Sequence, residues 1–545
     1  MNVSRIFVLG FILCCCASSI LGEKASEIYK RQEKDPWFMD GVKFIEDGVK
    51  LKQIKTKAKN VILFLGDGMG VSTVTAARIL QGQLQKKTGE EHILSWERFP
   101  NVALSKTYNT DQQTPDSAGT ATAFMTGVKA KAGVISVDDK ADYASCEKSF
   151  GTSVLSIAEM AELKGLATGV VTTARITHAT PATAYSHTSS RRWESDGSLP
   201  DKRCKDIARQ LIEFSHGDGL EIAMGGGRYN FMPDNETDPE YPTKKGNRKD
   251  GRNLINEWKA KSNGGQKWDY VWNDSQFQQL DVNKVDHVLG LFEPSHMQYS
   301  VNRLADAAGE PSLTNMTEFA IKMLSKNKNG FFLLVEGGRI DHGHHSSKAH
   351  LALHDAVEMA NAVAKAVSMT KEEETLIVVT ADHSHTFVIA GYPKRGNPIL
   401  GLVDETGAKV TGYVKDKKSY TTLGYMNGPG AKVNATRDDP AKDDVKSADY
   451  RQQSLVPMDS ETHSGEDVGV YARGPRAHLI HGVLEQNAIF HVMDYALCLS
   501  DSKKTLCEDQ SRVTNSAFSS NVSRNFLHIL MPALTFLFLS RLIII

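Results

Sequence analysis

The sequence predicts an α/β fold, a three-layer sandwich in which helices cover both faces of one large, mostly parallel sheet. Short, largely apolar runs alternate along the chain with longer stretches of helical periodicity. Strands that are apolar on both faces are typical of a parallel sheet buried between helices. The strands expected from this pattern are 60–66, 165–173, 220–226, 330–336, 374–382 and 467–474. The expected helices are 72–83, 117–127, 153–163, 204–215, 315–326, 347–369 and 484–498.

Two segments depart from this alternation and predict insertions in one main domain that spans 23–515. Residues 393–460 are rich in Gly, Lys, Asp and Tyr and have weak periodicity. We interpret them as a loop-rich, crown-like insertion and not as a separate enzyme. Residues 230–280 carry Pro, Asn and Gly throughout, which also predicts a loop-rich insertion.

The composition is that of an ordinary globular protein. The chain has 545 residues, of which 40% are apolar and 24% are charged. A length of this kind suits one large domain or several ordinary ones. The net charge of −1 gives no basic field, so a nucleic-acid partner is not expected.

Both ends of the chain carry processing signals. Residues 1–22 contain one Arg, then an apolar run and small residues, the pattern of a secretory signal peptide. An apolar tail, 526–545, follows a polar spacer and a small-residue site that begins at Asn515. This order predicts a GPI anchor on Asn515, removal of 516–545, and a place on the extracellular face of the plasma membrane. A membrane-spanning helix is the alternative, which Arg541 inside the tail disfavours.

Cysteine and sequon usage agrees with secretion. Of the seven cysteines, those outside the expected signal peptide are Cys146, Cys204, Cys498 and Cys507. An oxidising compartment favours two disulfides, and four cysteines allow three pairings. We favour Cys146–Cys204 and Cys498–Cys507, because the second pair closes a short local loop. Glycosylation is expected at Asn235, Asn273, Asn315 and Asn434, whereas a further sequon at Asn521 would leave with the tail.

Three carboxylates each follow an expected strand. Asp67 follows VILFLG, Glu336 follows FFLLV, and Asp382 follows LIVVTA. The carboxyl ends of parallel strands form the binding crevice of open α/β sheets, so we expect these acids to converge. Burying them without partners costs several kcal/mol each, and bound cations are the natural compensation. Taken alone, an Asp that follows a strand, such as Asp67, is about as often a helix cap as a metal ligand.

Histidines gather beside two of these acids. A lone histidine is more often a core or surface residue than a ligand, but two dense Asp/His clusters beside strand ends reverse that expectation. Carboxylate and imidazole ligands without thiolates suit zinc in a hydrolytic site. The candidates are Asp341, His342, His344 and His345 after Glu336, His383 and His385 after Asp382, and His463 in ETHSGED.

The candidate nucleophile is Ser117 in TPDSAGTATAF, where a small-residue helix is expected to begin. A serine there feels the positive end of the helix dipole, which favours an alkoxide and a bound phosphate. The alternative is that Asp116 and Ser117 only cap the helix. No G-x-S-x-G elbow is present, so zinc and not a histidine base is the expected activator. Arg191 and Arg192 offer a phosphate-binding fork, with a solvated surface pair as the alternative.

Six motifs together resemble the animal-type (metazoan), membrane-bound and glycolipid-anchored alkaline phosphatases. They are FLGDGMG, PDSAGTATAFMTGVK, THATPATAYSHTSSR, VEGGRIDHGHH, TADHSH and ETHSGED. Each motif alone is weakly specific, but all six occur in register between about residues 65 and 470. The resemblance implies an alkaline phosphatase-like fold and a phosphate monoester hydrolase (EC 3.1.3.1) with a phosphoserine intermediate.

The resemblance also implies a role for each matching residue. Ser117 becomes phosphorylated and also contacts a zinc ion, Arg191 holds the phosphate, and Asp116 orients Arg191. The ligands that it implies are Asp341, His345 and His463 for one zinc, Asp67, Asp382 and His383 for a second, and Asp67, Thr180 and Glu336 for one magnesium. His178 and His342 occupy positions that are histidine in animal-type members, and His385 is similar to a nearby family histidine.

A fourth, calcium-like site is implied within an insertion at about 230–310. Its expected ligands are Glu240, the carbonyl of Phe292, Glu293 and Glu310. Many animal members have Asp at the position of Glu310, so this ligand departs from the family pattern. A homodimer is implied by the resemblance alone.

Three rival functions were weighed against this one. A sulfatase would need a C-x-P-x-R setting, which the sequence lacks. A metal phosphodiesterase would more often have Thr at the position of Ser117. A catalytically inactive cell-surface binding protein would first lose ligands or nucleophile, and all are present. We therefore expect small phosphomonoester substrates and an activity that rises with pH, because metal ligands must be deprotonated.

Overall fold

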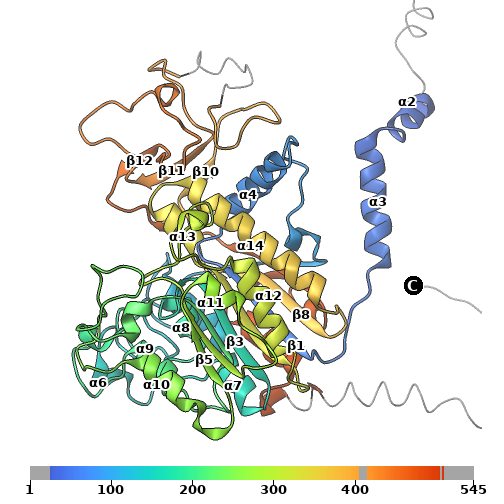
Figure 1. Cartoon of the computed structure of the whole chain (residues 1–545). Coiled ribbons are helices and arrows are strands. Elements are labelled where there is room, and N and C mark those ends of the chain that lie inside the picture. The colour runs from blue at the N-terminus through green and yellow to red at the C-terminus, as the bar shows by residue number, and fades with distance from the viewer. Residues whose placement is uncertain (1–24, 404–413, 504–505, 508–545) are drawn as a thin grey trace, which may run out of the picture.

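The computed structural model describes residues 25–403, 414–503 and 506–507. The expected signal peptide, the anchor residue Asn515, the segment 516–545 and the sequon at Asn521 lie outside these residues. Figure 1 shows a body built around the large sheet, a smaller sheet above it, and two N-terminal helices to one side.

The body is built on a ten-stranded sheet, with the strand order β15-β2-β14-β8-β1-β7-β3-β4-β6-β5. All six expected strands are present: β1 (Asn60–Gly66), β3 (Ala167–Arg175), β4 (Ile222–Gly226), β7 (Phe331–Gly337), β8 (Thr375–Ala381) and β14 (Val468–Arg473). The others are β2 (Asn101–Lys106), β5 (Trp268–Val271), β6 (His287–Leu291) and β15 (Gly482–Glu485). Strand β14 pairs antiparallel with β2 and β8, and the remaining pairs are parallel, which confirms the α/β class.

Helices cover both faces of this sheet, as Figure 1 shows. One face packs against α4 (Val71–Leu84), α12 (Leu313–Leu324) and α14 (Ala349–Met369). The other packs against α5 (Ser117–Thr126), α7 (Ile157–Leu163), α9 (Ile207–Ile212), α10 (Leu254–Ala260) and α15 (Ala488–Leu497). The shorter helices are α6 (Cys146–Ser149), α8 (Ala179–Ala182), α11 (Asp274–Gln278) and α13 (Arg339–His345).

The central strand β1 explains why the chain folds as three layers. Its residues alternate in direction: Ile62 and Phe64 enter one core, while Leu63 and Leu65 enter the other. All are fully buried, so NVILFLG needs apolar neighbours on both sides. The three-layer prediction is therefore confirmed.

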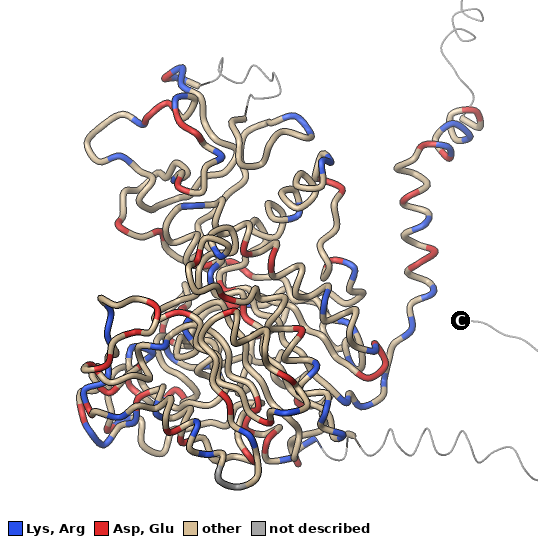
Figure 2. Tube along the Cα trace, viewed as in Figure 1, with Lys and Arg blue, Asp and Glu red and all other residues tan. Residues whose placement is uncertain are grey.

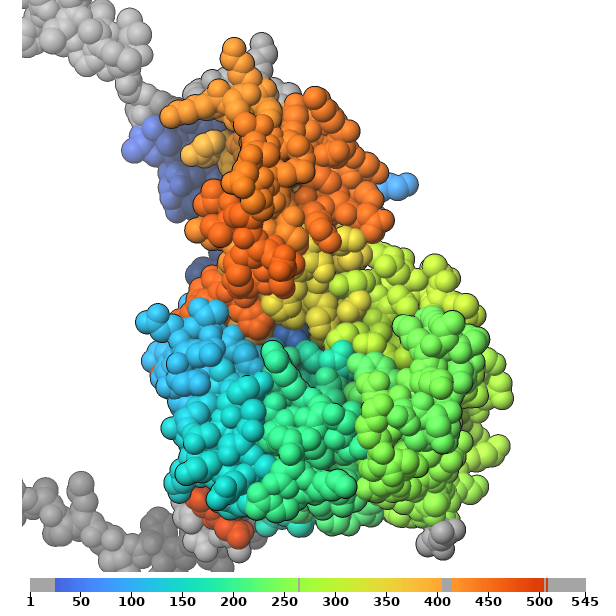
Figure 3. Space-filling model, turned by 90° about the vertical axis from the view of Figure 1, so that its left-hand side faces the viewer, coloured from blue at the N-terminus to red at the C-terminus, as the bar shows by residue number. Residues whose placement is uncertain are grey.

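A smaller sheet stands on the body within the segment that departed from the alternating pattern. It consists of β10 (Phe387–Ile389), β11 (Leu423–Gly428) and β12 (Ser454–Pro457). A two-stranded ladder of β9 (Ser384–His385) and β13 (His463–Ser464) lies at its base. Figure 3 shows this part of the chain as an orange lobe above the body. The ladder brings two of the expected histidine positions, His385 and His463, face to face.

Two N-terminal helices were not expected from the sequence. They are α2 (Ala25–Gln32) and α3 (Pro36–Lys50), and none of their residues is buried. Figure 1 shows α3 standing to the side of the body. Among the described residues, no helix has both the length and the apolar character needed to cross a membrane.

Both favoured disulfides are present in the structure. Cys146 pairs with Cys204 across 58 residues of sequence, and Cys498 pairs with Cys507 across nine. The two pairing predictions are therefore confirmed. Figure 2 shows Lys and Arg interspersed with Asp and Glu along the described trace, in keeping with a net charge near zero.

Candidate active site

Three neighbouring strands bring the three expected carboxylates to one edge of the sheet. Strand β1 lies between β7 and β8, with Leu65 paired to Glu336 and Gly66 paired to Ala381. Asp67 and Asp382 each follow directly after these paired positions. All three carboxylates are fully buried. Parallel register therefore gathers them, as the strand-end argument predicted.

These acids carry unsatisfied oxygens. Asp67 Oδ2, Asp382 Oδ2 and Glu336 Oε1 are buried and have no hydrogen-bond partner among the described residues. Burial, followed by the charges of Asp382 and other acids, raises the pKa of Asp67 well above its ordinary value. Burial likewise raises the pKa of Glu336 to about 7. Orphaned buried oxygens and mutual repulsion are what a bound cation removes, so these residues fit a metal site.

One donor group consists of Asp67, Asp382 and His383, with one ligand atom from each lying within 4.8 Å of the others. Asp382 Oδ1 accepts from the backbone N–H groups of Gly68 at 3.0 Å and His383 at 2.9 Å. These bonds hold the carboxylate so that its other oxygen lies 3.2 Å from His383 Nε2. Burial lowers the pKa of His383, which leaves the imidazole neutral, the form that binds metals.

A second donor group combines Asp341 and His345 of α13 with His463 of β13. His345 Nε2 and His463 Nε2 are 3.2 Å apart, and each lies 3.4 Å from Asp341 Oδ1. His463 Nδ1 donates to the Pro115 carbonyl at 2.8 Å, and His345 Nδ1 donates to the Glu461 carbonyl at 2.5 Å. Both Nε2 atoms are then lone-pair acceptors that cannot bond each other. A shared cation accounts for their close approach.

His385 is tied into the same group but is already fully bonded. Its Nε2 lies 2.8 Å from Asp341 Oδ1, and its Nδ1 lies 2.6 Å from Glu461 Oε2. Although burial lowers its pKa, the hydrogen bonds to Asp341 and Glu461 outweigh this and raise the pKa of His385 to about 10. The ring therefore links Asp341 to Glu461 and positions the Asp341 carboxylate. Sequence reasoning gave no role to Glu461, the first residue of the ETHSGED motif, which contacts His385 across 76 residues.

Ser117 is the first residue of α5, and its side chain faces the first donor group. Ser117 Oγ lies 3.1 Å from His383 Nε2 and 3.4 Å from Asp67 Oδ1. Of the two residues that could have capped the helix, only Asp116 does so. Its carboxylate accepts from the backbone N–H groups of Ala118 and Gly119. The Ser117 hydroxyl is buried, freed from capping, and placed at the positive end of the helix dipole.

Asp116 and His178 hold the side chain of Arg191, so it is not part of a solvated surface pair. Its Nη1 donates to Asp116 Oδ2 at 3.0 Å, and its Nη2 lies 3.0 Å from His178 Nε2. Burial and the charge of Arg191 lower the pKa of His178, so its ring is neutral and can accept. Arg192, by contrast, is exposed.

Two cavities adjoin this centre, and Asp116 lines both of them. One, of about 800 Å³, is lined among others by His345, Ser460 and His463. The other, of about 610 Å³, is lined among others by His178 and Arg191. Asp116, which holds Arg191, is therefore common to the cavity beside the second donor group and the cavity beside the arginine.

The expected magnesium ligands also meet. Thr180 in α8 is fully buried, and its Oγ1 has no hydrogen-bond partner among the described residues, whereas the hydrogen bond from Thr172 partly offsets the effect of burial on the pKa of Glu336. Thr172 Oγ1 donates to Glu336 Oε2. Thr172 was not expected from the sequence, although it is paired with Glu336 across the strands β3 and β7.

The candidate calcium ligands form a separate acidic cluster. Burial, followed by the charges of Glu293 and Asp306, raises the pKa of Glu310 to about 9. Burial and the charge of Glu293 raise the pKa of Glu240 to about 7. Phe292, whose carbonyl is the remaining expected ligand, directly precedes Glu293, and its side chain is fully buried. Asp306, which sequence reasoning missed, carries a buried and unpartnered Oδ2 in the same cluster.

A family model described as alkaline phosphatase matches residues 58–499 of the chain. The chain belongs to the alkaline phosphatase family. The tissue-nonspecific alkaline phosphatase of Gallus gallus is 47% identical over 510 residues, 92% of this chain and 95% of that protein. That of Homo sapiens is 47% identical over 504 residues, 90% and 93% of the two chains. An alkaline phosphatase of Gadus morhua is 48% identical over 486 residues, 87% of this chain and all of that protein.

Solved alkaline phosphatases share the fold. The enzyme of the Antarctic bacterium TAB5 superposes with a TM-score of 0.56 at 24% identity, over 82% of this chain and all of that one. The Thermus thermophilus enzyme superposes with a TM-score of 0.59 at 23% identity, over 82% of this chain and 93% of that one. The family identification from the six motifs is therefore confirmed, and the fold with it.

Proposed function

We propose that this alkaline phosphatase hydrolyses phosphate monoesters through a phosphoserine at Ser117, supported by two zinc ions and one magnesium ion. The observation that carries the proposal is the place of Ser117 Oγ, 3.1 Å from His383 Nε2 and 3.4 Å from Asp67 Oδ1. A hydroxyl group among buried side chains that can bind metal ions, close to an arginine that is held in place, is arranged for phosphoryl transfer.

The donor chemistry supports the choice of metals. Asp341, His345 and His463 would hold one zinc, and Asp67, Asp382 and His383 the other, because both sets mix carboxylate with neutral imidazole. Asp67, Thr180 and Glu336 offer only oxygen, which suits magnesium. When bound, these ions supply positive charge that lowers the pKa of a hydroxyl or water and stabilises the leaving oxygen.

The chain's own residues account for the steps of the reaction. Arg191 donates two N–H groups to phosphate oxygens and holds the phosphorus atom in line with Ser117 Oγ. Ser117 Oγ releases its proton to water and attacks phosphorus, and the ester oxygen leaves and takes a proton from water. The phosphate on Ser117 lies at the N-terminus of α5, whose dipole stabilises its negative charge. Water then attacks phosphorus and loses a proton, the Ser117 O–P bond breaks, Ser117 Oγ regains a proton, and phosphate departs.

The acidic cluster of Glu240, Glu293 and Glu310 would hold a calcium ion, with the carbonyl of Phe292 as a further ligand. Four acids lie within electrostatic reach of one another there, since Asp306 raises the pKa of Glu240, Glu293 and Glu310. An all-oxygen set of this kind suits calcium. We include Asp306 as an additional acid at this site.

Secretion, glycosylation and membrane attachment form part of the proposal. Two disulfides are favoured in an oxidising compartment. Of the four sequons within the expected mature chain, Asn235, Asn315 and Asn434 are exposed and Asn273 is half-buried. The GPI anchor at Asn515 would place the enzyme on the extracellular face of the plasma membrane.

A homodimer is supported by the apolar stripe of helix α3. Phe38, Val42, Ile45 and Val49 recur at helical spacing, and Ile45 and Val49 are 62% and 82% exposed. Helix α3 buries none of its residues within the part of the chain that the structure describes, and a second copy of the chain is the occupant that we propose for its apolar stripe.

Hydrolysis of nitrophenyl phosphate, with and without a chelator and followed by zinc addition, tests the proposed function. We expect loss of activity on chelation and recovery with zinc. Parallel assays with the corresponding diester and sulfate separate the rival hydrolases. Preferential turnover of the diester or the sulfate, or full activity after complete metal removal, would overturn the proposal.

A further inference from the structure

Asn315 differs from the other sequon residues in its surroundings. It lies in the first turn of α12, is exposed, and its side-chain amide has no hydrogen bond among the described residues. Asn273, by contrast, uses its side-chain oxygen to cap α11 by accepting from the backbone N–H of Gln276. Asn235 and Asn434 lie in loops. Asn315 therefore presents a side-chain amide that is free to receive a glycan, and it does so from a helix.

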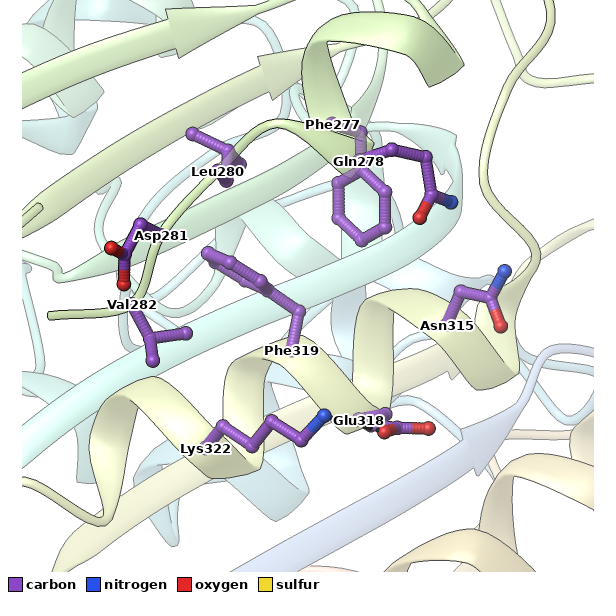
Figure 4. A pocket seen from close by; sticks show the side chains of 9 residues that line it. All are labelled: Phe277, Gln278, Leu280, Asp281, Val282, Asn315, Glu318, Phe319 and Lys322. Atoms are coloured by element: carbon purple, nitrogen blue, oxygen red, sulfur yellow. Dashed lines mark hydrogen bonds and ion pairs between the residues drawn. The ribbon is translucent and has the colours of Figure 1, made fainter. Parts of the chain in front are cut away.

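A cavity of about 450 Å³ begins at Asn315 and follows the outer face of α12. Its helical side consists of Asn315, Glu318, Phe319 and Lys322, which share one stripe of the helix. Seven residues separate Asn315 from Lys322, so the stripe is about 10 Å long. The facing side is formed by the end of α11 and the loop that follows it, as Figure 4 shows.

The lining has an apolar floor and a polar rim. Phe277 and Phe319 lie with ring centroids 5.5 Å apart, and Leu280 and Val282 continue the apolar surface (Figure 4). The rim carries the side chains Gln278, Asp281, Glu318 and Lys322. Lys322 Nζ donates to Glu318 Oε1 at 2.6 Å, which holds both groups at the edge.

A pyranose ring matches this arrangement. One face of an N-acetylglucosamine ring presents C–H groups that pack on apolar side chains, while hydroxyl and acetamido groups at its edge bond amide, carboxylate and ammonium groups. A freely diffusing ligand would have no tether here. A sugar bonded to Asn315 Nδ2 starts at the mouth of the cavity, and its effective concentration there is high.

We propose that the first sugars of an N-linked glycan on Asn315 pack along α12 in this cavity. The proposal rests on the secretion proposed above. In the modification, Asn315 Nδ2 attacks C1 of N-acetylglucosamine in a lipid diphosphate-linked oligosaccharide, loses one proton, and releases the lipid diphosphate. The attached sugars then cover the apolar floor of the cavity, where Leu280 and Val282 are half-buried.

The test follows removal of each glycan from the native, full-length secreted enzyme by a peptide N-glycosidase, which converts the acceptor Asn to Asp. Peptide mass spectrometry gives the rate at each site. We expect Asn315 to be released at least about tenfold more slowly than Asn235 and Asn434, because its first sugar must leave the cavity before cleavage. In denaturant the rates should be equal.

Two variants separate packing in the cavity from a general fold effect. The double variant Gln278→Ala/Lys322→Ala removes rim contacts without touching the apolar floor and should bring release at Asn315 to the rate of the loop sites. Lys328→Ala changes an exposed lysine outside the lining and should leave the protection intact. Asn315→Gln should lower Tm by about 2 °C, whereas Asn434→Gln should not change it.

Equal release rates at Asn315 and Asn235 in the native enzyme would overturn the inference. So would a secreted chain that carries a glycan at Asn235 and none at Asn315, a result that leaves secretion and phosphatase activity standing. Absence of glycan from every sequon would overturn both the inference and the proposed secretion.

Discussion

Glu461 Oε2 lies 2.6 Å from Nδ1 of His385, whose other nitrogen contacts Asp341 Oδ1 at 2.8 Å. The second oxygen of Glu461 accepts from the backbone N–H and the hydroxyl group of Thr386, both at 2.7 Å. The backbone carbonyl of Glu461 accepts from His345 Nδ1. One buried residue thus fixes two of the three donors proposed for one zinc, and it precedes the third, His463, by two positions.

Replacing Glu461 by Ala should weaken metal binding more than it alters the fold. His385 would lose the partner that orients it, and Asp341 would lose its fixed direction, so the affinity for zinc should fall about 10- to 100-fold. Competition with a chromogenic chelator measures that affinity directly. The control is Asp459→Asn, which replaces an exposed carboxylate two positions before Glu461 and should leave the affinity for zinc unchanged. An unaltered affinity in Glu461→Ala would contradict the positioning role.

Asp116 caps α5, holds Arg191 and accepts from the backbone N–H of Gly133 at 2.7 Å. Asp116→Ser keeps a side-chain acceptor for the helix N-terminus but is too short to reach Arg191 or Gly133. Inhibition by inorganic phosphate should therefore weaken about tenfold or more, with a loss of about 1 kcal/mol of stability from the Gly133 hydrogen bond. Asp116→Ala should lose the same phosphate affinity and about 1 kcal/mol more stability than Asp116→Ser, because the cap is lost as well. Phosphate inhibition constants and thermal unfolding measure the two effects. Unchanged phosphate inhibition in Asp116→Ser would show that Arg191 needs no partner.

A buried acid pair on the sheet's other edge makes stability depend on pH. Burial, together with the charge of Glu221, raises the pKa of Glu162 to about 9 from an ordinary value near 4.5. Between these values the folded state binds a proton that the unfolded chain releases, so this contribution is present at low pH and is lost as pH rises toward 9.

Glu162→Gln should therefore stabilise the enzyme selectively in alkali. The amide keeps the hydrogen bond from Thr168 Oγ1 and removes the ionisation, so the variant should gain at least about 1 kcal/mol at pH 9.5 and less at pH 7. Unfolding curves at both pH values provide the measurement, and Glu373→Gln, on the surface, is the control. A gain that does not depend on pH would contradict the assigned cause.

Helix α3 offers a direct test of the homodimer. Ile45→Glu places a charge in the apolar stripe of a helix that buries none of its residues within the described part of the chain, so the monomer should fold normally and the dimer should weaken. Sedimentation velocity at several concentrations measures the change. Lys43→Glu, on the polar side, serves as the control. A monomeric native enzyme, or a dimer unaffected by Ile45→Glu, would remove the role given to α3.

The sequence predicted the central strands because both their faces are buried, which leaves an uninterrupted apolar run such as NVILFLG. Strand β2 escaped this test because its burial alternates, and its neighbour β15, at the edge of the sheet, because none of its residues is buried. Helix α3 was missed for a related reason, since none of its residues is buried.

The candidate ligands could be found from sequence because strand ends and dense Asp/His clusters mark them locally. The residues that hold these ligands in place could not be found in this way. Glu461 and Thr172 contact the site across 76 and 164 residues, and Asp306 lies in a loop without periodicity. Such contacts exist only after the sheet register and the β9–β13 ladder have formed. The assignment of ligands to particular metals came from the family resemblance.

The central claim is that Ser117 becomes phosphorylated, and rapid acid quenching with a phosphate monoester at mildly acidic pH tests it most directly. Peptide mass spectrometry of the quenched native enzyme should find one phosphate on the peptide that contains Ser117. The same experiment with Ser117→Ala should find none, although Arg191 still binds phosphate. Covalent phosphate trapped at another residue in Ser117→Ala, or steady turnover by that variant at the native rate, would contradict the account.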